Sequence, residues 1–332
     1  MEQNISEKME ISGEDEVKNI FDHTKIELAC APMLKVTTPP FRKFLRIICK
    51  EVILYTEMIV INTVTNVSEE KLNFLLGDPE DNTVVQLGGS DPEMCVKAVE
   101  KLLKMGYKQF NLNCGCPSDR VQKGMFGAIL MKHKELVAEI VNRVYEETGV
   151  IITLKTRIGA DDCDSYEFFR EFIDYIYKNT KCRKFYVHAR KCWLKGLSPT
   201  QNRNVPPLRY DYVYRIKEEF NDCFIGINGG IKYKNIEKTG NCDGAMIGRD
   251  AMADIETFNK ILNIKTDILK SLEEYFNWAI NSEYHLSKII YPIVHLRKGK
   301  TNSKLYKLKI NELIQNKIDI KEAYEQIKPF FE

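Results

Sequence analysis

The chain has 332 residues, of which 44% are hydrophobic and 29% are charged, and its formal net charge is +2. This composition is typical of a folded protein with a full core, and it excludes a largely disordered chain. It also excludes a protein that binds nucleic acid through its overall charge alone. No apolar run approaches the roughly 20 residues that a membrane-spanning helix needs, so we expect a soluble, cytoplasmic protein without a membrane partner.

The N-terminal segment and the ten cysteines give further expectations. Residues 1–27 carry eight acidic residues and three lysines, so residues 1–25 are predicted to be an acidic, flexible leader. The segment is too acidic for a transit peptide and lacks the apolar stretch of a signal peptide. Without a secretion signal, the cysteines indicate free thiols in a reducing compartment. Cys114 and Cys116 form the only close pair, with no second pair or nearby histidine, so no metal site is expected.

Eight short apolar runs, each followed by small or polar residues, alternate with stretches of helical periodicity. The predicted strands are 26–29, 52–55, 83–87, 110–113, 151–157, 184–190, 224–228 and 244–247, and the clearest helices between them are 91–105, 135–148 and 165–179. This alternation predicts an α/β fold, a (β/α)8 TIM barrel over residues 26–254. After residue 255 the strand pattern stops, and helices are predicted at 261–280, 286–296 and 310–327. These form an expected C-terminal helical domain, residues 255–332.

The helical domain contains a basic segment, residues 284–309, with seven bases and no acidic residue. A local cluster of this kind is a candidate surface for a polyanion. The bases are Lys288, Arg297, Lys298, Lys300, Lys304, Lys307 and Lys309.

Polar residues gather at the predicted carboxyl ends of the strands, the rim at which TIM barrels place their active sites. They are Gln86, Asn113, Lys155, Arg157, His188, Arg190, Asn228 and Arg249. Gly229, Gly230 and Gly248 end strands seven and eight, where barrels commonly bind phosphate through backbone amides. The rim therefore predicts a site for a phosphorylated cofactor.

Cys116 follows the fourth predicted strand and points to proton transfer. A thiol with a pKa of about 8.5 is mostly protonated at neutral pH and can deliver its proton to a carbanion. Lys155 would project into the same cavity, where a fixed cation stabilises a reduced, anionic flavin. Hydride transfer to one face and proton transfer to the other would reduce an activated double bond. The alternative, a buried structural thiol, stays open at this point.

The motifs of residues 26–252 resemble those of the dihydrouridine synthases, flavoenzymes that reduce uridine in tRNA, and are most similar to the A-type bacterial group. They include Ala31-Pro32-Met33, Gln86-Leu87-Gly88-Gly89, Asn111-Leu112-Asn113, Gly115-Cys116-Pro117-Ser118, Lys155-Thr156-Arg157, His188-Ala189-Arg190-Lys191 and Asn228-Gly229-Gly230. The resemblance implies an enzyme that uses FMN and NADPH to form 5,6-dihydrouridine in tRNA, at position 20 or 20a of the D-loop. We expect it to act as a monomer.

The resemblance also implies roles for individual residues. Cys116 would donate the proton to C5 while hydride goes to C6, Asn113 and Arg157 would lie near the flipped uracil, and Arg190, Lys191 and Arg203 would meet the tRNA. Lys300, Lys304 and Lys307 are the expected tRNA contacts of the helical domain, where the A-type group has arginines. FMN would be held by Ala31, Pro32, Met33, Gln86, Lys155, His188, Asn228, Gly229, Gly230, Gly248 and Arg249.

Two other functions are compatible with parts of the pattern. A flavin barrel acting on a small free pyrimidine would have similar chemistry but would not need a basic helical tail. A non-catalytic tRNA-binding protein would not need Cys116 or Lys155. The chain also departs from the A-type motifs at Cys114, which replaces an aliphatic residue, and at Cys192, which stands where alanine is common.

Overall fold

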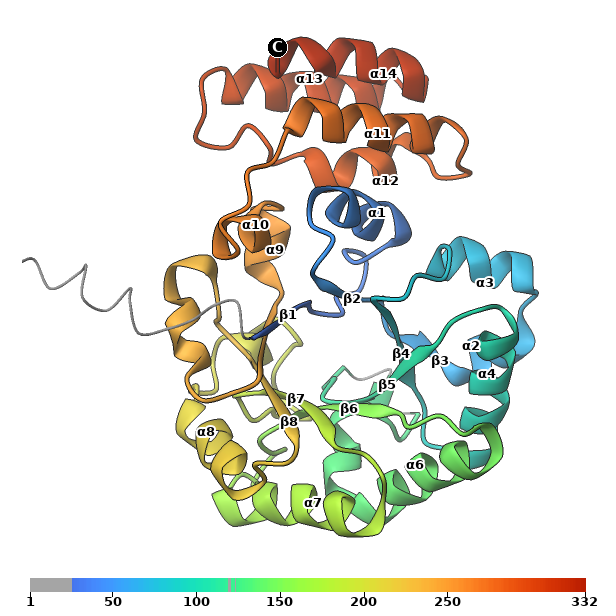
Figure 1. Ribbon diagram of the computed structural model, residues 1–332, viewed down its shortest axis with the longest axis vertical. Coiled ribbons are helices and arrows are strands. Elements are labelled where there is room, and N and C mark those ends of the chain that lie inside the picture. The colour runs from blue at the N-terminus through green and yellow to red at the C-terminus, as the bar shows by residue number, and fades with distance from the viewer. Residues whose placement is uncertain (1–25, 119–120, 123) are drawn as a thin grey trace, which may run out of the picture.

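The structure is a computed structural model that describes residues 26–118, 121–122 and 124–332 (Figure 1). The predicted acidic leader, residues 1–25, lies outside the described residues. Eight parallel strands close into a barrel, because β9 pairs with β1 and β2 pairs with β4. The predicted TIM barrel is confirmed. Its strands are β1 (Glu27–Cys30), β2 (Ile53–Tyr55), β4 (Thr83–Gly88), β5 (Gln109–Cys114), β6 (Thr153–Arg157), β7 (Lys184–His188), β8 (Phe224–Asn228) and β9 (Gly244–Ile247).

A further short strand, β3 (Ile59–Val60), was not predicted. It pairs with the end of β4, where Ile59 lies opposite Leu87 and Val60 opposite Gly88. β2 covers only the beginning of β4, at Thr83 and Val84, so the outer end of β4 needs a second partner. Two residues are too few to show a strand periodicity in the sequence.

Helices form the outer ring of the barrel (Figure 1), and the three predicted ones are present within a residue of their expected ends. Asp91 caps α4 by accepting a hydrogen bond from the Met94 N–H (2.8 Å), and Ser165 caps α7 in the same way. The ring consists of α1 (Pro39–Ile48), α2 (Ile61–Asn66), α3 (Glu69–Leu76), α4 (Pro92–Lys104), a 3₁₀ helix (Gly127–Lys132), α6 (Lys134–Thr148), α7 (Tyr166–Asn179) and α8 (Tyr210–Glu219).

The C-terminal helices are shorter than predicted. The expected helix 261–280 is wrong, because Asn263 has a left-handed φ of 54° and Asp267 caps a new helix. The expected helix 310–327 breaks at Lys317, where φ is 49°. The expected helix 286–296 ends at Ile290, and a 3₁₀ turn with Pro292 follows it. The observed helices are α9 (Arg249–Ala253), α10 (Thr257–Ile261), α11 (Ile268–Ile280), α12 (Leu286–Ile290), α13 (Ser303–Gln315) and α14 (Ile320–Ile327).

Helices α11 and α12 pack against α1 of the barrel (Figure 1), and the loop between them contacts α3 through Tyr284. The rings of Phe44 and Tyr275 lie 5.0 Å apart, and both are fully buried. Tyr284 stacks on Phe74 at 5.0 Å and donates a hydrogen bond of 2.9 Å to the Phe74 carbonyl. These contacts fix the helical unit on one side of the barrel.

The amino-terminal half of the barrel interior is filled by side chains. Tyr55 and Tyr186 meet edge to face with their ring centroids 6.0 Å apart. Gly226 makes room for Tyr186, since a Cβ there would lie 2.2 Å from the tyrosine ring. Glu27 accepts a hydrogen bond from the Tyr186 hydroxyl (2.8 Å) and pairs with Lys184 (2.6 Å). Space for a ligand inside the barrel is therefore left at the carboxyl ends of the strands.

Candidate functional site

The register of the strands brings the predicted rim residues together. Asn113 lies opposite Lys155 on the next strand, and His188 lies opposite both Arg157 and Asn228. The Lys155 ammonium donates a hydrogen bond of 3.0 Å to the Asn228 side-chain oxygen, so the two side chains meet inside the barrel mouth.

Lys155 and His188 both lie in an environment that disfavours positive charge. Burial, followed by the charge of Arg157, lowers the pKa of Lys155 to about 7. Burial and the charges of Arg157 and Lys155 hold the pKa of His188 well below its usual range, so the imidazole is neutral. The buried Nδ1 of His188 has no hydrogen-bond partner in the described part of the chain. A buried polar atom of this kind is expected to meet a ligand or water.

The rim carries a group of cations that no nearby carboxylate neutralises. The groups that shift the pKa values of Lys155, Arg157, Arg190 and Arg203 include other arginines and cysteines but no described carboxylate. Arg249 lowers the pKa values of both Arg190 and Arg203 after the larger effect of burial. This concentration of positive charge favours phosphate groups or another polyanion.

The glycines that follow β8 and β9 lie where predicted cofactor residues converge. Gly229 and Gly230 have φ values of 111° and 75°, which other residues rarely adopt. A Cβ at Gly229 would lie 3.3 Å from the imidazole of His188. A Cβ at Gly248 would lie 3.3 Å from the sulfur of Met33 and 3.4 Å from Ala31. The glycine backbone thus lies directly beside the side chains that the sequence assigned to the same ligand.

Cys116 lies in a turn directly after β5. The side-chain oxygen of Asn113 accepts hydrogen bonds from the backbone N–H groups of Gly115 (3.0 Å) and Cys116 (2.9 Å). The Cys116 carbonyl accepts a further hydrogen bond from Ala128 (2.9 Å). Cys116 is half-buried and close enough to Lys155 to influence its pKa. The thiol is therefore positioned at the same mouth as the cations.

The other two cysteines of this region are different. Cys114 is fully buried among apolar side chains, and burial raises its pKa far above the usual range. Cys192 is also fully buried, and burial raises its pKa to about 11. Among these three thiols only Cys116 is accessible, so Cys114 and Cys192, rather than Cys116, have the burial expected of structural thiols.

Two predicted substrate residues are engaged in the scaffold. Arg157 is buried and donates hydrogen bonds to the carbonyls of Gly115 (2.7 Å), Lys191 (3.0 Å) and Asn202 (3.2 Å). It ties the turn of Cys116 to the loop after β7. Lys191 pairs with Asp164 at 2.5 Å. Neither residue is a free surface cation, which the sequence pattern could not reveal.

The loop after β7 is also held by a buried residue to which the sequence analysis gave no role. The Asn202 side chain accepts a hydrogen bond from the Trp193 N–H (2.8 Å) and donates one to the Trp193 carbonyl (2.9 Å). The neighbouring Arg203 and Arg249 remain at the rim, with Arg249 donating to the Asn204 side chain at 2.5 Å. No composition or spacing signal distinguishes such a buried amide from a surface asparagine.

The basic segment 284–309 is divided by the fold. Lys304 and Lys307 are exposed on α13, and the Lys300 side chain is 51% exposed, with Glu256 3.9 Å away. Lys309 instead pairs with Glu312 at 2.9 Å. The three lysines that were predicted to contact tRNA are thus accessible, whereas Lys309 is partly neutralised by Glu312.

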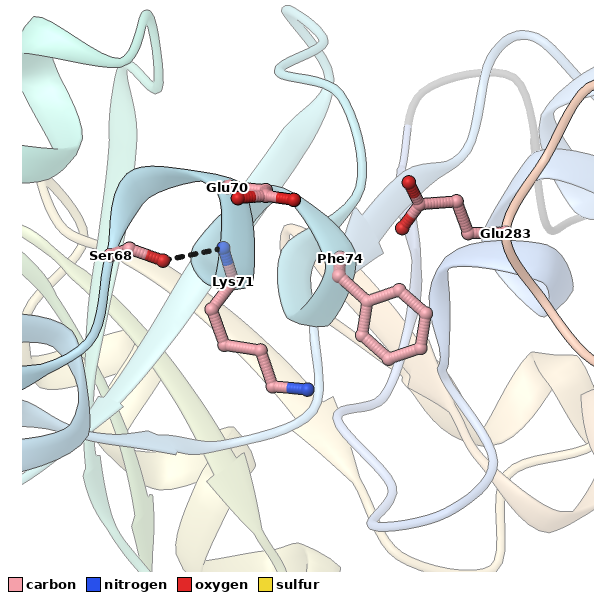
Figure 2. A pocket seen from close by; sticks show the side chains of 5 residues that line it. All are labelled: Ser68, Glu70, Lys71, Phe74 and Glu283. Carbon is pink, nitrogen blue, oxygen red and sulfur yellow. Dashed lines mark hydrogen bonds between the residues drawn. The ribbon is translucent and has the colours of Figure 1, made fainter.

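A separate surface hollow of about 340 Å³ lies between α3 and the loop that precedes α12. Figure 2 shows Glu283 opposite Phe74, with Glu70 and Lys71 farther along α3. The hollow contains none of the predicted site residues, so it is distinct from the barrel mouth.

Two further features concern membranes and metals. Within the described ranges, no helix combines the length and the hydropathy needed to cross a bilayer. The same residues contain no group of three or more histidine, cysteine, aspartate or glutamate side chains arranged to hold a metal ion.

Comparisons with known proteins show which family the chain is similar to. The family described as "Dihydrouridine synthase (Dus)" matches residues 29–328. A tRNA-dihydrouridine(20/20a) synthase of Vibrio parahaemolyticus is 38% identical over 298 residues, 86% of this chain and 90% of the relative. The protein of the same name from Pasteurella multocida is 45% identical over 226 residues, 67% of each chain. That of Escherichia coli K12 is 42% identical over 231 residues, 69% of this chain and 66% of the relative.

Proposed function

Because the chain belongs to the dihydrouridine synthase family, an enzyme family of oxidoreductases, we propose that it reduces a uridine of tRNA to 5,6-dihydrouridine. The names of its relatives support position 20 or 20a as the target. The observation that carries the proposal is the accessible thiol of Cys116 at a barrel mouth rich in unneutralised cations. This combination suits proton delivery to a substrate that carries phosphates.

The mouth fits FMN as the cofactor. The unpartnered Nδ1 of His188 and the left-handed glycine backbone at Gly229 and Gly230 support a polar ligand with a phosphate. Lys155 would lie beside its ring and Arg249 beside its phosphate, with Ala31, Pro32, Met33, Gln86, Asn228 and Gly248 completing the site. When bound, FMN supplies the hydride, which it regains from NADPH.

Cys116 would supply the proton. Its sulfur delivers a proton to C5 of the uracil as hydride reaches C6, so that the double bond gains two hydrogens and the thiolate regains its proton from solvent. Lys155 provides positive charge that stabilises a negatively charged reduced ring. Asn113 has one N–H of its amide left for a uracil oxygen, and Arg157 keeps the Cys116 turn near the substrate.

The base must leave its stack in the tRNA to reach this mouth, and surrounding cations would hold the RNA. Arg190 and Arg203 lie at the rim, and Lys300, Lys304 and Lys307 extend the basic surface onto the helical unit. Lys191 contributes less free charge because it already pairs with Asp164.

The proposal is tested by incubating the purified protein with FMN, NADPH and unmodified tRNA, followed by mapping of dihydrouridine. We expect one or two modified positions in the D-loop, and no product with free uridine. Reduction of free uridine at a comparable rate would favour the small-pyrimidine alternative. A tRNA-binding protein that produces no dihydrouridine would favour the non-catalytic alternative.

A further inference from the structure

Polar side chains form a continuous hydrogen-bonded chain across the interior of the barrel, below Cys116. Asn113 donates to the Gln86 oxygen (2.8 Å), and Gln86 donates to the Asn111 oxygen (2.8 Å). Asn111 donates to the Thr153 hydroxyl (2.9 Å), which donates to the Phe110 carbonyl (3.2 Å). Gln86, Asn111 and Thr153 are neighbours in register on β4, β5 and β6. Barrel interiors are usually apolar at this level, so a continuous line of polar side chains is unusual here.

The two ends of the chain are backbone groups, and they fix the orientation of every amide between them. The N–H groups of Gly115 and Cys116 can only donate, so Asn113 must present its oxygen to them. Its nitrogen then faces the Gln86 oxygen, the Gln86 nitrogen faces the Asn111 oxygen, and the Asn111 nitrogen faces the Thr153 hydroxyl. At the other end the Phe110 carbonyl can only accept, which orients the Thr153 hydroxyl. A head-to-tail chain of this kind is cooperative, because each hydrogen bond polarises the next.

Breaking the chain at its far end therefore has a consequence at Cys116. Without the Thr153 oxygen, the Asn111 nitrogen loses its acceptor in a buried environment, where an unpaired polar group costs about 1–3 kcal/mol. The Asn111 side chain can recover an acceptor only by shifting, and the Gln86 and Asn113 amides that hydrogen-bond to it must move with it. This movement loosens the two hydrogen bonds that Asn113 accepts from the turn that carries the thiol.

We propose that Asn111 and Thr153 are positioning residues, which hold the Cys116 thiol at the barrel mouth through the amides of Gln86 and Asn113. Neither residue hydrogen-bonds to Cys116 itself. The inference rests on the proposed role of Cys116 as proton donor for its effect on the reaction, but the position of the thiol can be measured without any reaction.

Thr153 can be replaced in two complementary ways, and the same strand offers a matched control. Thr153→Val removes the hydroxyl at constant volume, whereas Thr153→Ser keeps the hydroxyl. Thr156→Val is the control on the same strand, because the Thr156 hydroxyl is buried but has no described hydrogen-bond partner. All three proteins are first compared by thermal unfolding, so that only folded variants are assayed.

The first measurement is the rate at which iodoacetamide alkylates Cys116, followed by mass spectrometry over a range of pH. Thr153→Val should change this rate about threefold or more, because the turn is no longer fixed, whereas Thr153→Ser and Thr156→Val should stay close to wild type. The second is single-turnover dihydrouridine formation by FMN-loaded enzyme. Thr153→Val should be slower by about tenfold or more with unchanged tRNA affinity, because a misplaced reacting group loses orientation.

Two results would have separate meanings. Equal alkylation and equal turnover of Thr153→Val, Thr153→Ser and wild type would overturn the positioning role, even if the wild-type enzyme forms dihydrouridine. Failure of wild-type protein to form dihydrouridine, with the alkylation pattern as expected, would overturn the proposed reaction while supporting the control of the thiol by Asn111 and Thr153.

Discussion

The exposed lysines of the helical unit allow a quantitative prediction about RNA binding. Each lysine that neutralises a phosphate releases counterions, so log affinity falls with log salt concentration by roughly 0.7–0.9 per contact. Replacing Lys300, Lys304 and Lys307 together by alanine should thus reduce the slope by about 2 to 3. Between 50 and 200 mM salt, wild-type affinity should fall about 20- to 40-fold more than that of the variant.

The assay is a salt titration of tRNA binding by fluorescence anisotropy. A charge-matched control replaces Lys104, Lys108 and Lys178, which are exposed beside the amino-terminal ends of the strands, away from the mouth. The control should keep the wild-type slope, and NADPH oxidation without tRNA should be unchanged in both variants. Identical slopes for wild type and the Lys300, Lys304 and Lys307 variant would refute a role for α13 and place the RNA on the arginines of the barrel rim.

Three other predictions concern the site and its support. Cys116→Ala should leave flavin reduction by NADPH intact but slow uridine reduction by about 100-fold or more, whereas Cys114→Val should change either rate only slightly. Equal losses of uridine reduction in the two variants, measured by stopped flow, would contradict the role of Cys116 as proton donor. The affinity of the apoprotein for FMN should fall as pH rises above about 7, because Lys155 loses its proton there and an anionic ligand binds the charged form better. Fluorescence titrations of Lys155→Met should show a weaker pH dependence. Tyr284→Phe should lower the free energy of unfolding by about 1 kcal/mol, measured with urea, because the Phe74 carbonyl loses its donor; no change would mean that the stacked rings alone hold the contact.

Lys155 also affects stability in a definite direction. Its pKa is lower in the folded protein than in the unfolded chain, so the unfolded chain binds more protons between the two values. The contribution of Lys155 should therefore make the unliganded protein more stable as pH rises above about 7. Lys155→Met should remove that part of the pH dependence.

The sequence predicted the barrel well because apolar runs and caps are local signals. The eight barrel strands and the helices capped by Asp91 and Ser165 lie close to their expected positions. The C-terminal breaks at Asn263 and Lys317 were missed, since a left-handed residue leaves the apolar periodicity on both sides intact. Local sequence patterns therefore predicted the positions of helices and strands better than the points at which a helix is interrupted.

The candidate site was predicted less evenly. Residue type predicted that Lys155, His188 and Cys116 lie at one mouth; the register brings the strands of Lys155 and His188 together, and Cys116 follows β5 beside them. Residue type could not show that Arg157 donates to three backbone carbonyls or that Lys191 pairs with Asp164. The buried amide of Asn111 was also missed as a functional element, because its role depends on partners on two other strands.

The filled lower half of the barrel has a kinetic consequence. Tyr55 and Tyr186 block the amino-terminal end, with Glu27 and Lys184 closing it beneath them. In the proposed function, a nicotinamide donor and an RNA base would reach a flavin bound in the mouth only through this same opening, and they would do so in turn. Turnover should follow an alternating, ping-pong order, in which excess tRNA slows the donor half-reaction by occupying the shared entrance.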